Sequence, residues 1–375
     1  MERILQYGIS SNLGGIESYI LQQMNYIDHD LLSYDFVYYG PAREFPYENQ
    51  IRDNGGRIYY LPWPKKNLKN FFLFYYHLAK IIKNNHYKGV VLNLINLRNA
   101  SILLIAKICG VPLRIIHSHN AGTVQKDNLK NKIINFIDKM IIKFSATNYF
   151  ACSNLAGKWM FGEKSKFALI PNAIECKKFE FNPLIRQKVR DNLKLEDKFV
   201  IGHVARFCRQ KNNEYVIEIY NQIYIRKKNS ILLLIGSYNN DAEERLIYQR
   251  VRKKIQEYGL CNNVIFLGMR KDVFELYQAM DCLLLPSHFE GFPVVAIEAQ
   301  AAGLPCYFSD KITAEVNITD LVTFLPIDTN PNLWAEKILT PSKIDRVNMN
   351  EKVAKAGYDI QANSKRIQDF YLQRK

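Results

Sequence analysis

The sequence predicts an α/β protein built from two doubly wound, Rossmann-like parallel sheets. Short apolar runs alternate with longer amphipathic segments along the chain, which is the pattern of strands joined by crossover helices. Several apolar runs end in glycine or polar residues, as strands do where a parallel sheet binds ligands at its carboxyl edge. A chain of 375 residues, of which 48% are hydrophobic, can bury the cores of two domains of ordinary size.

The first half of the chain carries this alternation clearly. Its predicted strands are Ile4–Tyr7, Asp35–Tyr39, Arg57–Leu61, Val90–Ile95, Arg114–Ser118, Tyr149–Cys152 and Lys166–Ile170. Its predicted helices are Ile16–Tyr26, Leu68–Lys83, Ala100–Ile108 and Ile133–Phe144. Between the first strand and the first helix, Gly14 and Gly15 would let the backbone approach a ligand closely, because glycine tolerates positive φ. The pair lacks the spacing of a dinucleotide-binding fingerprint.

The second half is organised around the stretch from Ser287 to Pro305. Predicted strands here are Phe199–Phe207, Ile231–Ile235, Val264–Gly268 and Cys282–Leu285, with helices at Glu243–Tyr258 and Val353–Leu372. The strand that ends at Leu285 leads through a Gly-Phe-Pro turn into a helical segment, and Pro293 suits the first helical position. Glu290 and Glu298 have seven residues between them. Because helical side chains lean toward the N-terminus, we expect Glu298 to point to the mouth that Glu290 lines.

His117 and His119 end a predicted strand of the first half, where apolar residues give way to polar ones. Side chains alternate along a strand, so both rings should lie on the same face of the sheet. A single histidine at such a place is more often structural than functional, since imidazole readily satisfies local backbone groups.

Cysteine and hydropathy patterns indicate a reduced, cytosolic enzyme. The seven cysteines are scattered and odd in number, without a Cys-x-x-Cys pair, which argues against disulfides and structural zinc. The chain begins with no signal-peptide pattern, and no apolar run approaches twenty residues. Asp28-His29-Asp30 follows the first helix and is interpreted as a turn, so we predict no essential metal.

The formal charge of +15 is unevenly distributed along the chain. Between Ile58 and Phe144, 14 basic residues face only Asp127 and Asp138. The basic residues include lysines in two basic-aromatic or amphipathic segments, Lys65–Tyr76 and Lys130–Phe144. Either segment alone is expected to bury its apolar face and solvate its lysines. Together with the local charge they favour an anionic partner, and we expect contact with an anionic membrane surface.

The stretch from Ser287 to Pro305 resembles the Glu-x7-Glu signature of the retaining family 4 glycosyltransferases, which have the two-domain GT-B fold. The resemblance includes the Gly-Phe-Pro after the first glutamate and covers nearly the full chain. Pro171-Asn172-Ala173-Ile174 is similar to the Pro-Asn-Gly segment with which this family leaves its first domain, although Ala173 and Glu175 depart from the usual Gly and Asp. The resemblance implies three parts, with two domains facing a central cleft and a last helix returning to the first: residues 1–178, 179–352 and 353–375.

The resemblance also implies roles for individual residues. Glu290 would meet the donor sugar, Glu298 the ribose hydroxyls, Arg206 and Lys211 the diphosphate, and either His119 or His117 the sugar or acceptor, with His119 the better match. The implied catalytic residues are His119, Glu290, Arg206 and Lys211. The implied donor-binding residues are Gly14, Gly15, Arg206, Lys211, Arg270, Gly291, Phe292, Pro293, Val294 and Glu298.

By this resemblance the chain is a metal-independent hexosyltransferase without a cofactor, using a nucleotide diphosphate sugar, UDP-linked by preference. Its motifs look most like bacterial exopolysaccharide and capsule enzymes, which act on lipid-diphosphate-linked oligosaccharides at the cytoplasmic membrane face. Three alternatives were weighed. A retaining glycosidase needs two free carboxyl groups about 5 Å apart, whereas one glutamate here is implied to bind ribose. A GT-B nucleotide-sugar epimerase would need no acceptor. A nucleic-acid-binding protein would use the basic half, but no recognisable nucleic-acid module is present.

Overall fold

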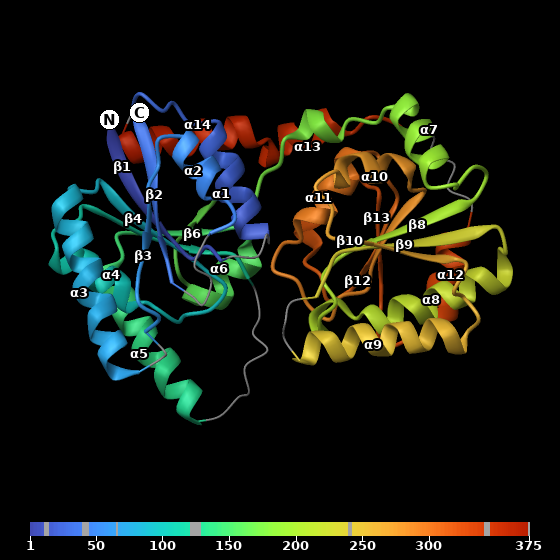
Figure 1. Cartoon of the computed structure of the whole chain (residues 1–375), viewed down its shortest axis with the longest axis horizontal. Coiled ribbons are helices and arrows are strands. Elements are labelled where there is room, and N and C mark those ends of the chain that lie inside the picture. Colours follow the sequence, from blue (N-terminus) through green and yellow to red (C-terminus); the bar gives the residue numbers. More distant parts are fainter. Residues whose placement is uncertain are drawn as a thin grey trace. The chain divides into compact units, whose positions relative to one another are not determined.

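The computed structural model describes residues 1–10, 15–39, 45–64, 67–120, 129–238, 242–340 and 346–373 (Figure 1). The chain divides into two compact units, one formed by Met1–Ile174 with Asp359–Lys375 and the other by Glu175–Tyr358. Each unit contains a wholly parallel sheet with helices on both faces, so the predicted doubly wound α/β class is confirmed.

The sheet of the first unit has seven strands in the order β3-β2-β1-β4-β5-β6-β7. These strands are β1 Glu2–Tyr7, β2 Leu32–Tyr38, β3 Ile58–Tyr60, β4 Gly89–Leu94, β5 Leu113–Ser118, β6 Asn148–Ala151 and β7 Ala168–Leu169. The helices are α1 Gly15–Asn25, α2 Glu48–Asp53, α3 Leu68–Asn85, α4 Ser101–Ile108, α5 Leu129–Ser145, α6 Asn154–Phe161 and α14 Ile360–Leu372.

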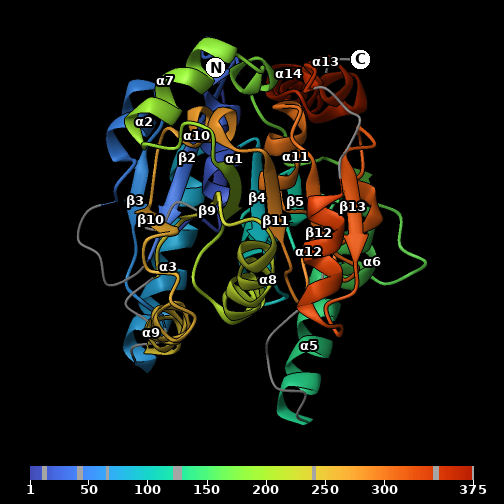
Figure 2. The same cartoon turned by 90° about the vertical axis from the view of Figure 1, so that its right-hand side faces the viewer.

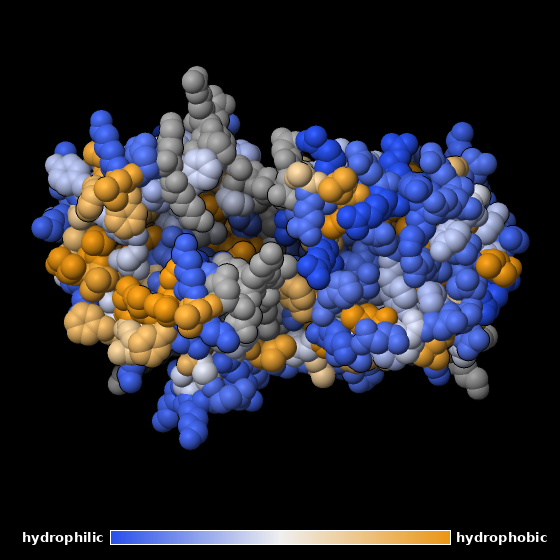
Figure 3. All heavy atoms as spheres, turned by 90° about the horizontal axis from the view of Figure 1, so that it is seen from below, coloured by the Kyte–Doolittle hydropathy of each residue, from blue (hydrophilic) through white to orange (hydrophobic). Residues whose placement is uncertain are grey.

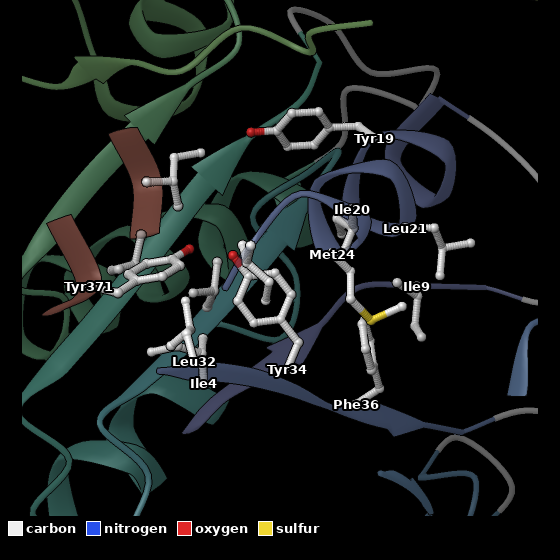
Figure 4. Packing of buried hydrophobic residues seen from close by; sticks show 14 of the residues in the cluster. Ile4, Ile9, Tyr19, Ile20, Leu21, Met24, Leu32, Tyr34, Phe36 and Tyr371 are labelled. Atoms are coloured by element: carbon white, nitrogen blue, oxygen red, sulfur yellow. The ribbon is translucent and has the colours of Figure 1, made fainter. Parts of the chain in front are cut away.

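Two apolar cores cover the two faces of this sheet. On one face, α1, α2 and α14 pack against side chains such as Ile4, Tyr34 and Phe36 (Figure 4). On the other face, α3 and α4 pack with parts of α5 and α6 against alternate strand residues, including Leu5 and Leu92. Adjacent residues of β1 therefore point to opposite cores, as the period of a strand requires.

The sheet of the second unit has six strands in the order β10-β9-β8-β11-β12-β13 (Figure 2). They are β8 Phe199–Val204, β9 Ser230–Ile235, β10 Val264–Gly268, β11 Cys282–Leu285, β12 Cys306–Ser309 and β13 Val322–Leu325. The helical segments are η1 Cys176–Phe179, α7 Pro183–Asn192, η2 Arg209–Lys211, α8 Asn213–Arg226, α9 Ala242–Glu257, α10 Val273–Ala279, α11 Val294–Ala301, η3 Ala314–Val316, α12 Pro331–Leu339, α13 Asn350–Val353 and η4 Ala354–Tyr358. One core lies between the sheet and α8, α9 and α12.

The prediction of one continuous terminal helix from Val353 to Leu372 is wrong. The chain passes from α13 through a single π-helical turn in which Gly357 has φ of 94°, a left-handed conformation that ends the helix. The α14 helix then starts afresh, because the Asp359 carboxylate accepts a hydrogen bond from the backbone N–H of Ala362. The Ile360 N–H donates to the carbonyl oxygen of Ile174 at 2.8 Å, so the two strands of chain that pass between the units lie side by side.

The last helix belongs to the first unit. It packs against α1, where the Tyr19 hydroxyl donates to Asn363 Oδ1 at 3.0 Å and the Asp28 N–H donates to Gln368 Oε1 at 2.6 Å. Buried side chains of α14, including Ile360 and Tyr371, complete one of the apolar cores of that unit. The return of the C-terminus therefore contributes to the core of the first unit.

Candidate active site

The candidate site of the second unit lies at the carboxyl ends of β8 and β11. These two strands are hydrogen-bonded neighbours, so the loops that follow them meet although they are far apart in sequence. The Lys211 ammonium lies 2.5 Å from Glu290 Oε1, and Gln210 Nε2 donates to Glu290 Oε2 at 3.1 Å. Only 16% of the Lys211 side chain and 7% of the Glu290 side chain are exposed. The loops thus join a cation and a carboxylate in a largely desolvated pair.

A buried histidine, His203, fixes the base of these loops. Its Nδ1 donates to the carbonyl oxygen of Leu284 in β11 at 2.8 Å, so Nε2 is the acceptor for Asn213 Nδ2 at 3.1 Å. Burial lowers the pKa of His203 to about 4, which keeps the imidazole neutral in this tautomer. One ring therefore ties β8 to β11 and to the start of α8. A histidine in an otherwise apolar strand was the available signal, and the sequence analysis overlooked it.

Glu298 lies on α11 and shares a hydrogen bond with a buried tyrosine. The Tyr277 hydroxyl donates to Glu298 Oε2 at 2.8 Å. Burial raises the pKa of Glu298 to about 7, against the opposing effects of this hydrogen bond and of the Lys178 charge. A carboxyl group held partly neutral in the free protein is available to pair with hydroxyl groups of a ligand. Tyr277 was not predicted from the sequence, where no pattern links it to Glu298.

The turn before α11 differs from the prediction at two residues. Pro293 occupies the N-cap rather than the first helical position, and no side chain caps this described helix. The Phe292 ring is buried and stacks on Tyr358 at a centroid distance of 5.2 Å. Its side chain therefore serves packing, and any contact of Phe292 with a ligand falls to its backbone.

The remaining predicted cations have partners of their own. Arg206 is half exposed and lies 3.2 Å from Glu244 Oε1, a carboxylate of α9. Arg270 forms two hydrogen bonds with Asp272, of 2.7 and 2.5 Å, which raise the pKa of Arg270 and lower that of Asp272. The structure therefore brings Lys211 and Glu290 together, and it places both arginines in separate, more exposed pairs.

His119 lies in the first unit, immediately after β5, within a buried amide network. Asn93 Nδ2 donates to Gln6 Oε1 at 3.0 Å and to the Tyr7 carbonyl at 3.1 Å, so Asn93 Oδ1 faces His119 Nε2 at 3.1 Å. His119 Nε2 must then carry the hydrogen, and Nδ1 accepts from the side-chain amide of Asn172, 3.0 Å away. Burial lowers the pKa of His119 to about 4, so the ring is neutral.

His117 shares the face of His119, as the strand alternation predicts. The two ring centroids are 3.9 Å apart, and His117 Nε2 donates to the carbonyl oxygen of Ile170 at 3.1 Å. Burial lowers the pKa of His117 as well. Gly15 begins α1 and is exposed, whereas the prediction for Gly14 lies outside the described residues. Glu17, also unpredicted, is a buried carboxylate that accepts from the N–H and hydroxyl of Ser10 at 2.8 and 2.7 Å.

Comparison with known proteins identifies the family. Residues 185–359 match the sequence profile of the family described as Glycosyl transferases group 1. Over 381 aligned residues the chain is 30% identical to EpsF of Bacillus subtilis (strain 168), assigned as a glycosyltransferase, with 99% of this chain and 96% of the relative covered. The chain belongs to the group 1 glycosyltransferases.

Two further likenesses agree with this family. The glycosyltransferase is 26% identical, over 71% of its length and 70% of the relative, to UDP-Gal:alpha-D-GlcNAc-diphosphoundecaprenol alpha-1,3-galactosyltransferase of Escherichia coli. Its structure is similar to sucrose-phosphate synthase from Thermosynechococcus elongatus, with a TM-score of 0.82 and 19% identity over 100% of this chain and 99% of that one. The two parallel-sheet domains and this neighbour confirm the predicted GT-B fold.

Replacing Arg206 of the glycosyltransferase by alanine should separate binding from folding. We expect the free energy of unfolding to change by less than about 0.5 kcal/mol, because the pair with Glu244 is half exposed. Turnover should fall about tenfold or more, because a phosphate contact of the guanidinium would be lost. Urea unfolding and steady-state kinetics measure the two effects. Arg250→Ala is the control, since its pair with Glu214 is similarly exposed; equal turnover of both variants would contradict the role of Arg206.

Replacing Glu298 by glutamine should stabilise the ligand-free glycosyltransferase by about 1 to 2 kcal/mol near pH 8. The folded enzyme keeps the Glu298 proton up to a pKa of about 7, whereas the ordinary value is 4.5. The stability that the neutral carboxyl provides is therefore complete below pH 4.5 and is lost as pH rises toward 7. The advantage of glutamine should grow over that interval.

Urea unfolding of both proteins across this pH range tests the prediction, and a difference that stays constant with pH would contradict it. UDP should at the same time bind the variant more weakly, because the charge that meets the ribose hydroxyls is gone.

Proposed function

We propose that the enzyme transfers a hexosyl group from a UDP-sugar, with retention at the anomeric carbon, to a lipid-diphosphate-linked oligosaccharide. This reaction would serve exopolysaccharide or capsule synthesis at the cytoplasmic face of the membrane. The observation that carries the proposal is the pairing of Lys211 with Glu290 at the ends of adjacent strands, with Glu298 on the helix that follows. The lipid-linked acceptor in the name of the Escherichia coli relative supports the acceptor class.

The chemistry of the transfer calls for the groups that the second unit holds. The bond between the anomeric carbon and the β-phosphate oxygen breaks, and UDP leaves with the electron pair. An acceptor hydroxyl oxygen forms the new bond, and its proton leaves with the departing phosphate. Lys211 would stabilise the negative charge that develops on that phosphate, and Glu290 would orient the sugar as it gains positive character. In the free enzyme each of these groups neutralises the other.

The donor is tested by calorimetry with UDP and GDP, followed by a screen of their sugars for turnover with and without added lipid-linked acceptor. We expect UDP to bind more tightly than GDP and the sugar to appear on the acceptor as the same anomer, which proton NMR can identify. Tighter binding of GDP would overturn the assignment of the donor. Release of an altered free sugar without acceptor would instead indicate an epimerase.

We expect the reaction to need no metal ion. Asp28 and Asp30 are explained by the turn after α1, where the Asp28 carboxylate accepts from the Asp30 N–H at 3.0 Å. Positive charge for the departing phosphate would come from Lys211 and Arg206. Turnover should survive EDTA, and Asp28→Asn should behave as the wild type. Loss of activity on chelation that manganese restores would contradict this prediction.

A further inference from the structure

The α5 helix presents its apolar stripe to solvent. Its exposed apolar residues recur at the spacing of a single helical face: Leu129, Ile133, Phe136, Ile137, Met140 and Phe144. Phe136 is 66% exposed and Met140 is 53% exposed. The prediction that this helix buries its apolar face in the domain is therefore wrong for most of its length. A soluble helix normally places such a stripe against the core.

Polar residues occupy much of the opposite, inward face of α5. Arg98, which follows β4, donates to Asn131 Oδ1 at 2.9 Å and lies 3.9 Å from Asp138 Oδ2. Ser145 and Ile142 are the buried residues of the helix. Because polar contacts help to attach α5 to the domain, its aromatic and aliphatic side chains remain available on the outside.

Neighbouring helices extend the same apolar surface. The α4 helix packs against both α3 and α5, and the three cover one face of the first sheet. Phe71, Phe72 and Tyr76 of α3 and Ile108 of α4 are exposed. Apolar residues gather over a broad region of the first unit in Figure 3, on the left of the view. Contiguous exposed apolar surface of this kind marks an interaction site.

Lysines border the stripe on both sides. On a helical wheel of 100° per residue, Lys130 lies beside one edge of the stripe, while Lys132, Lys139 and Lys143 lie beside the other, and all four are exposed. Asp138, the acidic residue of this helix, faces inward toward Arg98. An apolar stripe between cationic borders complements a bilayer surface, where acyl chains lie beneath anionic headgroups.

We propose that α5, together with the exposed aromatic residues of α3, docks the enzyme on an anionic lipid bilayer by inserting its apolar stripe below the headgroups. The proposal rests on the proposed function, because it specifies how an enzyme of a lipid-linked acceptor reaches the membrane. It differs from attraction by charge alone, which was the expectation from the sequence. Lysines attract the enzyme to the surface, and the buried apolar side chains hold it there. Among the described helices, none has both the length and the hydropathy to span a membrane.

Vesicle co-sedimentation with three variants tests the insertion. The first replaces Phe136, Ile137 and Met140 by glutamine, which preserves helix propensity. Phe144 is left intact, because its ring lies under the Lys107 ammonium. The matched control replaces Leu184, Ile225 and Leu246 by glutamine, exposed apolar residues of the second unit. The third replaces Lys130, Lys139 and Lys143 by glutamine.

Wild type and control should bind vesicles of phosphatidylglycerol with phosphatidylcholine equally, and a fraction of that binding should resist about 1 M salt. The Phe136, Ile137 and Met140 variant should bind at least about tenfold more weakly at low salt and lose the resistant fraction. The lysine variant should lose mainly the salt-sensitive part. Equal binding of the apolar variant and wild type would overturn the proposal.

A single Phe136→Trp variant reports insertion directly. Its fluorescence should shift to the blue on vesicle addition and be quenched by brominated acyl chains, whereas Leu246→Trp should show neither change. Light scattering must find the wild type and the apolar variant in the same oligomeric state. A wild-type dimer that the variant loses would assign the stripe to a second copy of the chain and overturn the lipid proposal. UDP binding by the apolar variant should equal that of the wild type; wild-type binding to vesicles but not to UDP would refute the proposed function alone.

Discussion

Replacing Lys211 by alanine should lower the free energy of unfolding by about 3 kcal/mol and turnover by roughly 100-fold or more. The stability loss arises because Glu290, of which only 7% is exposed, keeps its charge without the ammonium 2.5 Å away. Gln210 still donates to Glu290, but a neutral amide offsets only part of the cost. The turnover loss arises because the departing phosphate would lack a preorganised cation.

A double variant separates these two effects. Adding Glu290→Gln to Lys211→Ala removes the unpaired charge, so most of the lost stability should return while turnover stays low. Lys254→Ala is the control for removal of a cation, because Lys254 pairs with Glu218 outside the site and both are more exposed. It should cost less than about 1 kcal/mol and leave turnover unchanged. A double variant as unstable as Lys211→Ala would show that the pair is not the source of the loss.

The fold was predictable because its signals are local and repeated. Apolar runs such as Val264–Gly268 and Cys282–Leu285 coincide with β10 and β11 at both ends. The four-residue strands β12 and β13 were missed, since so short a run does not establish a period. The break at Gly357 was also missed, because a glycine within a helical pattern is often tolerated and only its φ of 94° reveals the stop.

The candidate site was predictable only as far as it follows a motif. Order along the chain located Lys211, Glu290 and Glu298, but their partners are set by the packing of distant segments. Tyr277 reaches Glu298 from another helix, and no spacing in the sequence announces that contact. The outward stripe of α5 could not be predicted for the same reason. Periodicity reveals that a helix has an apolar face, whereas the direction of that face depends on what anchors the other side.

Replacing His119 by phenylalanine should lower the free energy of unfolding by about 2 to 4 kcal/mol and turnover by roughly 100-fold. The ring fits the space, but Asn93 Oδ1 and the Asn172 amide, both buried, lose their partner. The catalytic part of the effect rests on the proposal that this histidine meets the sugar or the acceptor. His119→Gln retains a donor and an acceptor, so it should recover part of the stability if the phenylalanine variant does not fold.

His117→Phe decides which histidine is functional. His117 makes one hydrogen bond, to the Ile170 carbonyl, so its loss should cost about 1 to 2 kcal/mol. Turnover per folded molecule should stay near the wild-type value, because we expect this ring to serve packing beside Tyr19 and Phe150. The measurement is UDP release at saturating donor, normalised to the folded fraction from circular dichroism. If His117→Phe loses turnover while His119→Gln keeps it, the roles are exchanged; if both keep it, the buried network of Asn93, His119 and Asn172 is structural, and the reacting groups lie in the second unit.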